Sequence, residues 1–264
     1  MPRLKLTLEY DGTRYVGWQV QPNGESIQSQ VARALGRLLG EPVAVSVAGR
    51  TDAGVHATGQ VVCFDTARTL PLKAYWRGLN GFLPEDIAVV RAEEVASDFD
   101  PRRWSHGKRY HYRVSNRPTR SPLRRFTHWE VFSPLDVEAL RRGAAHLVGR
   151  HDFSAFRASD CQAAHAVREV RRVDIQGASG GELSFRVEGT AFLKHMVRNL
   201  VGTLVEVGRG RRPDAWVAEV LASRDRTRAG PTAPPQGLVL EEVFYGEGPP
   251  PRSPGGMADG DEEG

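Results

Sequence analysis

The chain begins with the stretch Leu4-Lys5-Leu6-Thr7-Leu8-Glu9-Tyr10, and the segment 26–40 follows it closely. Apolar and polar residues alternate strictly over residues 4–10, which is typical of a β-strand with one buried face. Ser26 is suited to cap a helix, apolar residues recur at helical spacing after it, and Gly40 is suited to end the helix. A half-buried strand followed by an amphipathic helix indicates a mixed fold, with helices packed on a sheet.

The next hundred residues extend this pattern. Apolar stretches predict strands over 43–48, 60–65 and 87–93, and a shorter helix fits residues 71–81. The resulting order is β-α-β-β-α-β, which is the ferredoxin-like arrangement.

The second half of the chain repeats that order. The predicted elements are a strand over 109–115, a helix from Ser133-Pro134, a hairpin of 167–176 with 182–188, helices over 192–207 and 213–223, and a strand over 238–245. We therefore predict an α+β fold of two ferredoxin-like β-α-β-β-α-β units, residues 1–103 and 104–246. The spelling G-x-S-x-G at 177–181 is expected to be the hairpin turn, because a nucleophile elbow needs a strand-to-helix turn.

Composition narrows the class of protein. The chain has 264 residues, of which 40% are hydrophobic, and no apolar run approaches the ~18 residues that a membrane span needs. No apolar leader block follows Met1, and the two cysteines, Cys63 and Cys161, form no metal or disulfide motif. These features predict a cytoplasmic protein that does not bind membranes.

Positive charge is concentrated in one stretch. Residues 102–125 contain nine Lys or Arg and no acid that offers them a partner, and three aromatic residues, Trp104, Tyr110 and Tyr112, lie among them. Clustered cations with flat rings favour nucleic-acid binding over a solvated charged face, in which the two signs usually alternate. The tail 247–264 has four more acidic than basic residues, so the rest of the chain carries +8 against +4 for the whole. Its composition predicts a disordered acidic tail.

The run Gly49-Arg50-Thr51-Asp52-Ala53-Gly54-Val55-His56 carries the strongest candidate for chemistry. Asp52 lies just after an apolar stretch, and Arg50 is placed to favour the ionised carboxylate. Such a carboxylate can serve as a nucleophile or a general base. The alternative is an ordinary turn, since Asp followed by Ala-Gly is good turn chemistry.

Further motifs occur in order along the chain. They are Tyr10-Asp11-Gly12-Thr13, Gly17-Trp18-Gln19, Ser26-Ile27-Gln28, Lys108-Arg109-Tyr110-His111-Tyr112, His195-Met196-Val197-Arg198-Asn199 and Gly230-Pro231-Thr232-Ala233-Pro234. Together with residues 49–56, this series resembles the tRNA pseudouridine synthase A family over residues 3–245. Each motif is weak alone, and the ordered set is specific.

The resemblance implies a function and an architecture. The function is isomerisation of uridine to pseudouridine at positions 38, 39 and 40 of the anticodon arm of tRNA. In the implied architecture, one chain has two α/β units whose antiparallel sheets lie side by side around an active-site cleft. Two such chains form a homodimer. The reaction involves neither a redox change nor a group donor, so no cofactor is expected. No metal site is expected either. His106 and His111, and His146 and His151, have zinc-finger-like spacing, but no Cys pair precedes them.

The resemblance also assigns roles to individual residues. Asp52 corresponds to the catalytic nucleophile, which acts at ribose C1′, at uracil C6 or on a ribose proton. Tyr110 corresponds to the tyrosine that stacks on the uracil, and Arg198 to the basic partner of the aspartate. Arg50 is a candidate to fill the gap left by an extruded uridine, and Leu238 to line the uracil pocket. The alternative for Tyr110 and Leu238 is core packing, and for Arg198 an exposed helix position.

Two other functions remain open at this point. One is a non-catalytic RNA-binding protein, since ferredoxin-like sheets often bind RNA, although the usual RNA-binding signature is absent here. The other is a nucleoside hydrolase or glycosidase, which would need a second acid near Asp52.

Overall fold

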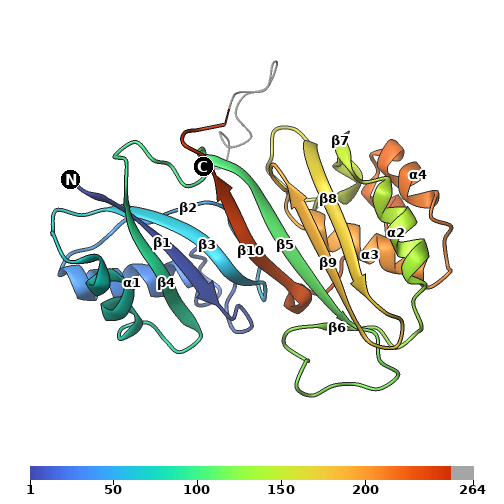
Figure 1. The fold of residues 1–264 in the computed structure, drawn as a ribbon, viewed down its shortest axis with the longest axis horizontal. Helices are drawn as coiled ribbons and strands as arrows, with labels where there is room; N and C mark the ends of the chain where they lie inside the picture. The colour runs from blue at the N-terminus through green and yellow to red at the C-terminus, as the bar shows by residue number, and fades with distance from the viewer. Residues whose placement is uncertain (251–264) are drawn as a thin grey trace. The chain divides into compact units, whose positions relative to one another are not determined.

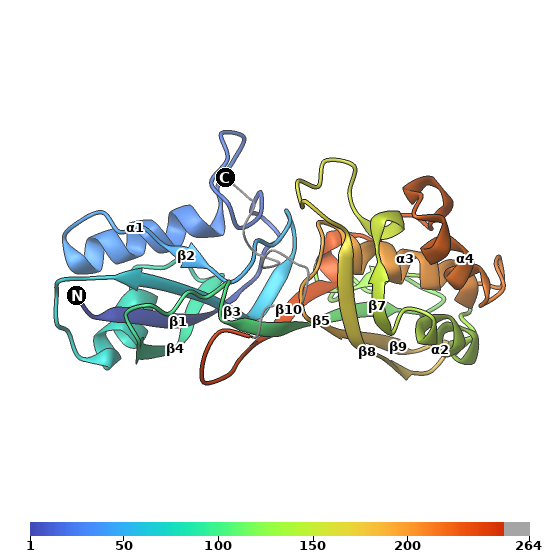
Figure 2. The same ribbon diagram turned by 90° about the horizontal axis from the view of Figure 1, so that it is seen from above.

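A computed structural model describes residues 1–250, and in it the chain forms two compact units. The first unit comprises residues 1–106 and the described residues from 240 on, and the second comprises residues 107–239. Figures 1 and 2 show that both units combine a sheet with helices, so the fold is α+β as predicted.

The first unit is built on an antiparallel sheet. Strand β1 (Arg3–Tyr10) lies between β3 (His56–Asp65) and β4 (Ile87–Val95), with Leu6 opposite both Val62 and Ala92. The short strand β2 (Ser46–Val47) pairs with β3, and β10 (Leu238–Tyr245) lies on the other side of β3. The strand predicted over 43–48 pairs only at residues 46–47, because it lies at a sheet edge and has almost no buried side chains to fix it.

Helix α1 (Ile27–Leu39) has the predicted ends. The Ser26 hydroxyl accepts a hydrogen bond from the Ser29 amide at 3.2 Å, and Gly40 adopts φ 76° after the last turn. The capping box and the left-handed C-cap satisfy backbone groups that the helix leaves unpaired. The helix predicted over 71–81 is confirmed over residues 72–80, and its central turn, η1 (Ala74–Gly78), is π-helical.

The second unit has the strand order β5-β9-β8-β7. Strand β5 (Ser105–Ser115) pairs antiparallel with β9 (Glu182–Gly189), placing Tyr110 opposite Val187. The predicted hairpin is confirmed as β8 (Val167–Gly177) and β9, so Gly177–Gly181 is its turn. Strands β6 (Trp129–Glu130) and β7 (Gly149–Asp152) were not predicted, because they are too short to show a pattern.

The helices of this unit pack together beside β8 and β9 (Figure 1). They are α2 (Val137–Ala145), α3 (Met196–Gly208) and α4 (Trp216–Ser223), with short helical turns η2 (Ser154–Phe156), η3 (Arg226–Arg228) and η4 (Pro235–Gly237). All three α-helices begin later than predicted. Asp136, not Ser133, caps α2 by accepting from the Ala139 amide, and His195 enters α3 with a left-handed φ of 62°.

The predicted domain limits, 1–103 and 104–246, stay a prediction. The contact pattern differs from them at two places, since residues 104–106 and the end of β10 from Leu240 on group with the first unit. Most of the predicted disordered tail, residues 251–264, lies outside the described residues. Among the helices of residues 1–250, none combines the length and the apolar character that crossing a membrane requires.

Candidate active site

Asp52 is half-buried at the start of a tight turn. The Val55 amide donates to the Asp52 carbonyl at 3.1 Å, and Gly54 adopts φ 76°. Gly17 pairs with Asp52 in a short bridge, and the Trp18 amide donates to the Thr51 carbonyl at 3.0 Å. The turn interpretation and the nucleophile interpretation are therefore compatible, because a turn held on both sides presents one carboxylate at a defined place.

A buried polar cluster contacts Gly49 and Thr51, which precede Asp52. The Tyr10 hydroxyl and the Thr51 hydroxyl are 2.8 Å apart, and the Gln60 amide donates to Tyr10 at 3.3 Å and to the Gly49 carbonyl at 2.8 Å. Burial raises the pKa of Tyr10 to about 12, although the hydrogen bonds from Thr51 and Gln60 oppose this. Tyr10 therefore stays neutral at physiological pH and holds the residues before Asp52 by hydrogen bonding.

Two glycines bring the segment 11–17 against the Asp52 turn. A Cβ on Gly12 would lie 2.0 Å from the Val55 carbonyl oxygen, and one on Gly17 would lie 2.7 Å from the Thr51 carbonyl oxygen. Gly17 also adopts φ 108°, a conformation that side chains rarely tolerate. These close approaches explain the glycines of the Asp11-Gly12-Thr13 and Gly17-Trp18-Gln19 motifs.

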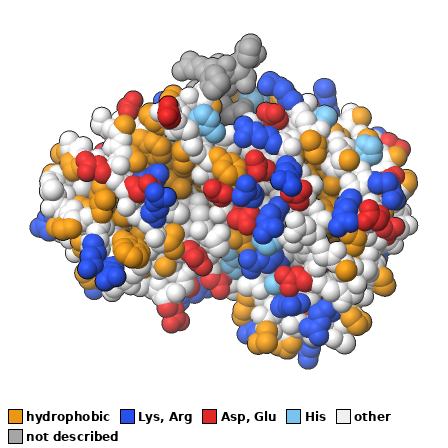
Figure 3. All heavy atoms as spheres, in the orientation of Figure 1, with side chains coloured by type: hydrophobic (Ala, Val, Ile, Leu, Met, Phe, Trp, Pro, Cys, Tyr) orange, Lys and Arg blue, Asp and Glu red, His pale blue; other side chains and the backbone are white. Residues whose placement is uncertain are grey.

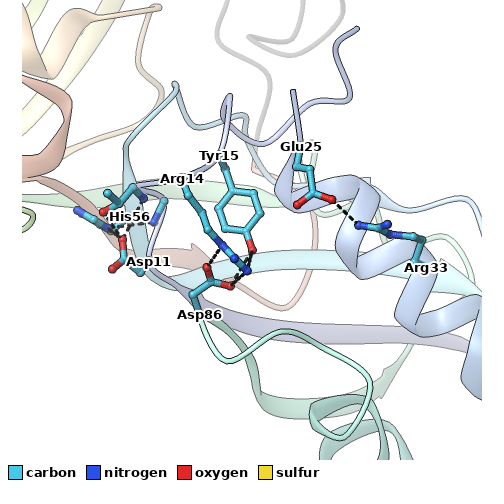
Figure 4. A network of polar contacts seen from close by, with 9 residues as sticks. Asp11, Arg14, Tyr15, Glu25, Arg33, His56 and Asp86 are labelled. Carbon is cyan, nitrogen blue, oxygen red and sulfur yellow. Dashed lines mark hydrogen bonds and ion pairs between the residues drawn. The ribbon is translucent and has the colours of Figure 1, made fainter. Parts of the chain in front are cut away.

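The segment 11–17 is itself anchored to the loop before β4. The Asp11 amide donates to the Asp86 carbonyl at 2.9 Å, and the Tyr15 hydroxyl donates to the Asp86 carboxylate at 2.6 Å (Figure 4). Arg14 forms an ion pair with the same carboxylate. The Gly54 amide donates to the Tyr15 carbonyl at 3.3 Å, so this anchor reaches the Asp52 turn directly.

In the second unit, Tyr110 lies on β5 and is only 8% exposed. Its ring meets that of Phe192 edge to face, with centroids 5.2 Å apart and planes at 84°. The contact fixes the orientation of the Tyr110 ring, as aromatic pairs of this geometry do. Phe192 was not predicted as a site residue, although its position just before the His195–Asn199 motif was a signal.

Arg198 lies in the first turn of α3 and is half-buried, so the exposed-helix alternative is wrong. Its Nε donates to the Ala233 carbonyl at 2.8 Å, and the Ala233 amide donates to the Arg198 carbonyl at 3.2 Å. The segment 230–234 is held against α3, where a Cβ on Gly202 would lie 1.7 Å from the Pro231 carbonyl oxygen. The Gly230–Pro234 motif thus orients the Arg198 guanidinium.

Asn199 strengthens this attachment from inside α3. Its side-chain amide donates to the Phe156 carbonyl at 2.7 Å, and its oxygen accepts from Thr232 at 2.7 Å and from Arg226 at 3.1 Å. Asn199 is fully buried, and a buried amide needs such partners. Arg198 and Asn199 therefore both hold segment 230–234 against α3, and Asn199 also bonds to Phe156 in the interior.

Leu238 is 6% exposed at the start of β10, directly after η4. The Tyr112 hydroxyl donates to the Pro234 carbonyl at 2.7 Å, and a Cβ on Gly237 would lie 2.6 Å from the Tyr112 ring. Burial raises the pKa of Tyr112 far above its ordinary value, against the effect of the Arg198 charge, so this hydroxyl stays protonated. Segment 230–238 thus links Tyr112, Arg198 and Leu238 within the second unit, whereas Asp52 and Arg50 belong to the first.

The family assignment comes from sequence comparison. The sequence model of the family described as tRNA pseudouridine synthase matches residues 7–102 and 144–246. This chain belongs to the tRNA pseudouridine synthase family. A synthase of this family breaks the bond between ribose C1′ and uracil N1 of a tRNA uridine and joins uracil C5 to the same C1′.

Individual relatives agree with this. The tRNA pseudouridine synthase A of Myxococcus xanthus is 75% identical over 263 residues, covering 100% of this chain and 99% of the relative. The tRNA pseudouridine synthase A of Pelobacter propionicus is 52% identical over 246 residues, covering 93% and 100%. A solved archaeal box H/ACA sRNP Nop10-Cbf5 complex aligns with a TM-score of 0.37 at 13% identity, over 76% of this chain and 44% of that one. A score this low does not establish a shared fold.

Four of the five residues predicted for the site of this synthase lie within the regions that the family model matches. Asp52 and Arg50 lie in the first matched region, and Arg198 and Leu238 lie in the second. Tyr110 lies between the two, so its role rests on the Lys108–Tyr112 motif and on its geometry. In residues 1–250 no group of three or more His, Cys, Asp and Glu side chains is arranged to hold a metal ion.

The basic stretch of the synthase contains no acid, but two of its cations have acid partners on the neighbouring strand β9. Arg124 pairs with Glu182 and Arg109 with Glu188, each at 3.1 Å. Arg117 and Arg120 are exposed on the loop between β5 and β6, a lobe where Figure 3 shows several Lys and Arg side chains.

Proposed function

We propose that the enzyme isomerises uridines at positions 38, 39 and 40 of the tRNA anticodon arm, with Asp52 as the catalytic nucleophile. The observation that carries the proposal is the support of the Asp52 turn. Gly17 pairs with Asp52 in a bridge, Gly12 lies against Val55, and the Tyr10 hydroxyl is hydrogen-bonded to Thr51. The turn contains the only carboxylate of the sequence between Glu41 and Asp65. Such support suits a side chain that must meet a reacting carbon, because catalytic groups have to be held in place.

The other residues bind the uridine around this carboxylate. Tyr110 keeps the detached uracil stacked while it turns, and Leu238 lines its pocket. Arg198, oriented by Ala233, neutralises the Asp52 carboxylate, which would be costly to bury alone. Arg50, exposed beside Asp52, fills the gap left by the extruded uridine and offsets part of the few kcal/mol that extrusion costs.

The architecture in this proposal is that of two ferredoxin-like units. The first unit has the order β1-α1-β2-β3-η1-β4, with each neighbouring strand pair antiparallel, which supports this arrangement. Each unit carries its own antiparallel strands, and the enzyme acts as a homodimer in the cytoplasm, where its tRNA substrate is found. No cofactor takes part.

Mapping of pseudouridine in tRNA tests the target positions. Transcripts carrying uridine at only one of positions 38, 39 and 40 of the anticodon arm are incubated with the enzyme, and pseudouridine is located by chemical modification and primer extension. We expect modification of each of the three transcripts and none of a transcript lacking uridine at all three. Pseudouridine elsewhere in the tRNA would overturn the assignment of the anticodon arm.

The exposed arginines of the β5–β6 loop should control affinity and leave the chemistry unchanged. Each phosphate contact releases counterions, so Arg117→Ala/Arg120→Ala should lower the slope of log affinity against log salt by about one unit per lost contact. Turnover at saturating tRNA should stay near the wild-type value, because substrate and transition state lose the same interaction. The measurements are salt titrations of tRNA binding and single-turnover rates.

A matched control removes two exposed arginines that already have acid partners. Arg33 pairs with Glu25 and Arg91 with Glu93, at 3.0 and 2.8 Å. Arg33→Ala/Arg91→Ala changes the net charge equally and should keep the wild-type salt slope. Equal slopes for both double variants would show that the loop arginines form a solvated face.

A further inference from the structure

His56 makes a buried contact that the roles above leave unexplained. It is the first residue of β3, directly after the Asp52 turn, and it is 6% exposed. Its Nδ1 accepts a hydrogen bond from the Gly12 amide at 3.0 Å, and an Asp11 carboxylate oxygen lies 3.1 Å from the same nitrogen (Figure 4). A histidine of the catalytic run is therefore bonded to the backbone of segment 11–17.

His56 Nδ1 faces two different groups: the Gly12 amide, from which it can only accept, and the Asp11 carboxylate, to which it could only donate. The bond to Gly12 is made by the ring form that has no proton on Nδ1. Asp11 does not depend on His56 for its own place, because its carboxylate accepts from the Thr13 amide at 2.9 Å and from the Thr13 hydroxyl at 2.5 Å. Asp11 and Thr13 form a self-contained turn, and Gly12 is the residue of that turn which His56 holds.

Gly12 is also the residue that touches the Asp52 turn. A Cβ on Gly12 would lie 2.0 Å from the Val55 carbonyl oxygen, so the two backbones are in direct contact. Val55 in turn donates its amide to the Asp52 carbonyl at 3.1 Å. The hydrogen bond from Gly12 to His56 Nδ1 therefore fixes Gly12 against Val55, and Val55 is hydrogen-bonded to Asp52. In this way His56 is connected to the backbone of Asp52 through two neighbouring contacts.

We infer that His56 is a positioning residue for Asp52, which it serves by accepting the Gly12 amide at Nδ1. The inference rests on the proposed role of Asp52. Without an acceptor the Gly12 amide is left buried and unpaired, and the segment must move toward water to satisfy it. A displacement of about 1 Å at a reacting group costs on the order of 10²-fold in rate, so Asp52 is sensitive to this movement.

Two substitutions of His56 separate the Nδ1 bond from the bulk of the ring. Asparagine places its oxygen near the position of Nδ1, while glutamine places its polar atoms further out, near Nε2. We expect His56→Asn to keep the single-turnover rate within several-fold of wild type. We expect His56→Gln to lose about 10²-fold in that rate and to keep its tRNA affinity, because the side chain is buried.

The measurements are single-turnover pseudouridine formation at saturating tRNA, tRNA binding and thermal unfolding. A rate loss in His56→Gln without a loss of affinity, together with an active His56→Asn, supports the inference. An active His56→Gln would overturn it, and so would an inactive His56→Asn, whatever the stability of the glutamine variant. Asp52→Asn is measured in the same assay, so an error in the role of Asp52 is recognised independently of His56.

Discussion

Asp52→Asn should abolish pseudouridine formation and leave tRNA binding within a few-fold of wild type. Asparagine keeps the shape of the side chain and so preserves the turn, in which the backbone of Asp52 bridges to Gly17 and accepts from Val55. It removes the negative charge and the nucleophilicity that the reaction requires. Because the turn is held mainly through backbone atoms, the loss falls on the chemical step.

The assay for this variant is single-turnover formation of pseudouridine, with tRNA affinity measured in parallel. Asp98→Asn is a matched control, because it removes the charge of an exposed aspartate of the same unit. The control should turn over as wild type does. Measurable pseudouridine formation by Asp52→Asn would remove Asp52 from the chemistry.

Tyr110→Phe should bind tRNA as wild type does and react more slowly by on the order of 10²–10⁴-fold, the range for a lost general acid–base group. The ring remains, and so does its edge-to-face contact with Phe192, so stacking on the uracil is retained. A fall of this size is expected if the hydroxyl takes part in proton transfer at uracil C5, which phenylalanine cannot do. Tyr110→Ala should lose the stacking contact as well and weaken tRNA binding.

Tyr75→Phe is the control for removal of a tyrosine hydroxyl. The Tyr75 hydroxyl donates to the Arg68 carbonyl at 2.9 Å in the first unit, so its loss should cost about 0.5–1.5 kcal/mol of stability and leave the rate unchanged. Thermal unfolding and single-turnover rates distinguish the two effects. A wild-type rate for Tyr110→Ala would mean that Tyr110 is only a packed strand residue.

Elements with a strong local signal were predictable from the sequence. Alternation over residues 4–10 predicted β1, and Ser26 and Gly40 predicted both ends of α1, because capping depends on neighbouring residues. Helix starts were less predictable. The predicted helix over 192–207 begins only at Met196, since His195 takes a left-handed conformation that its sequence does not signal.

In the candidate site, the residues that stand in motifs could be predicted, and their hydrogen-bond partners from distant parts of the chain could not. Asp52, Tyr110 and Arg198 stand in motifs, so their candidacy was visible in the sequence. Their supports were not visible, because each acts across a long separation along the chain, as Gln60 does on Tyr10 and Asn199 on Thr232. A hydrogen bond between residues distant in sequence leaves no periodic pattern, and only the fold shows it.

Release of tritium from tRNA labelled at uracil C5 tests the account most directly. Isomerisation replaces the C5 hydrogen by the bond to ribose C1′, whereas binding alone or hydrolysis of the glycosidic bond leaves that hydrogen on the base. We predict that the wild-type enzyme releases one tritium for each pseudouridine formed, with no free uracil, and that Asp52→Asn releases none. Free labelled uracil would indicate a hydrolase, and bound tRNA without any release would indicate a non-catalytic RNA-binding protein; either result would contradict the account.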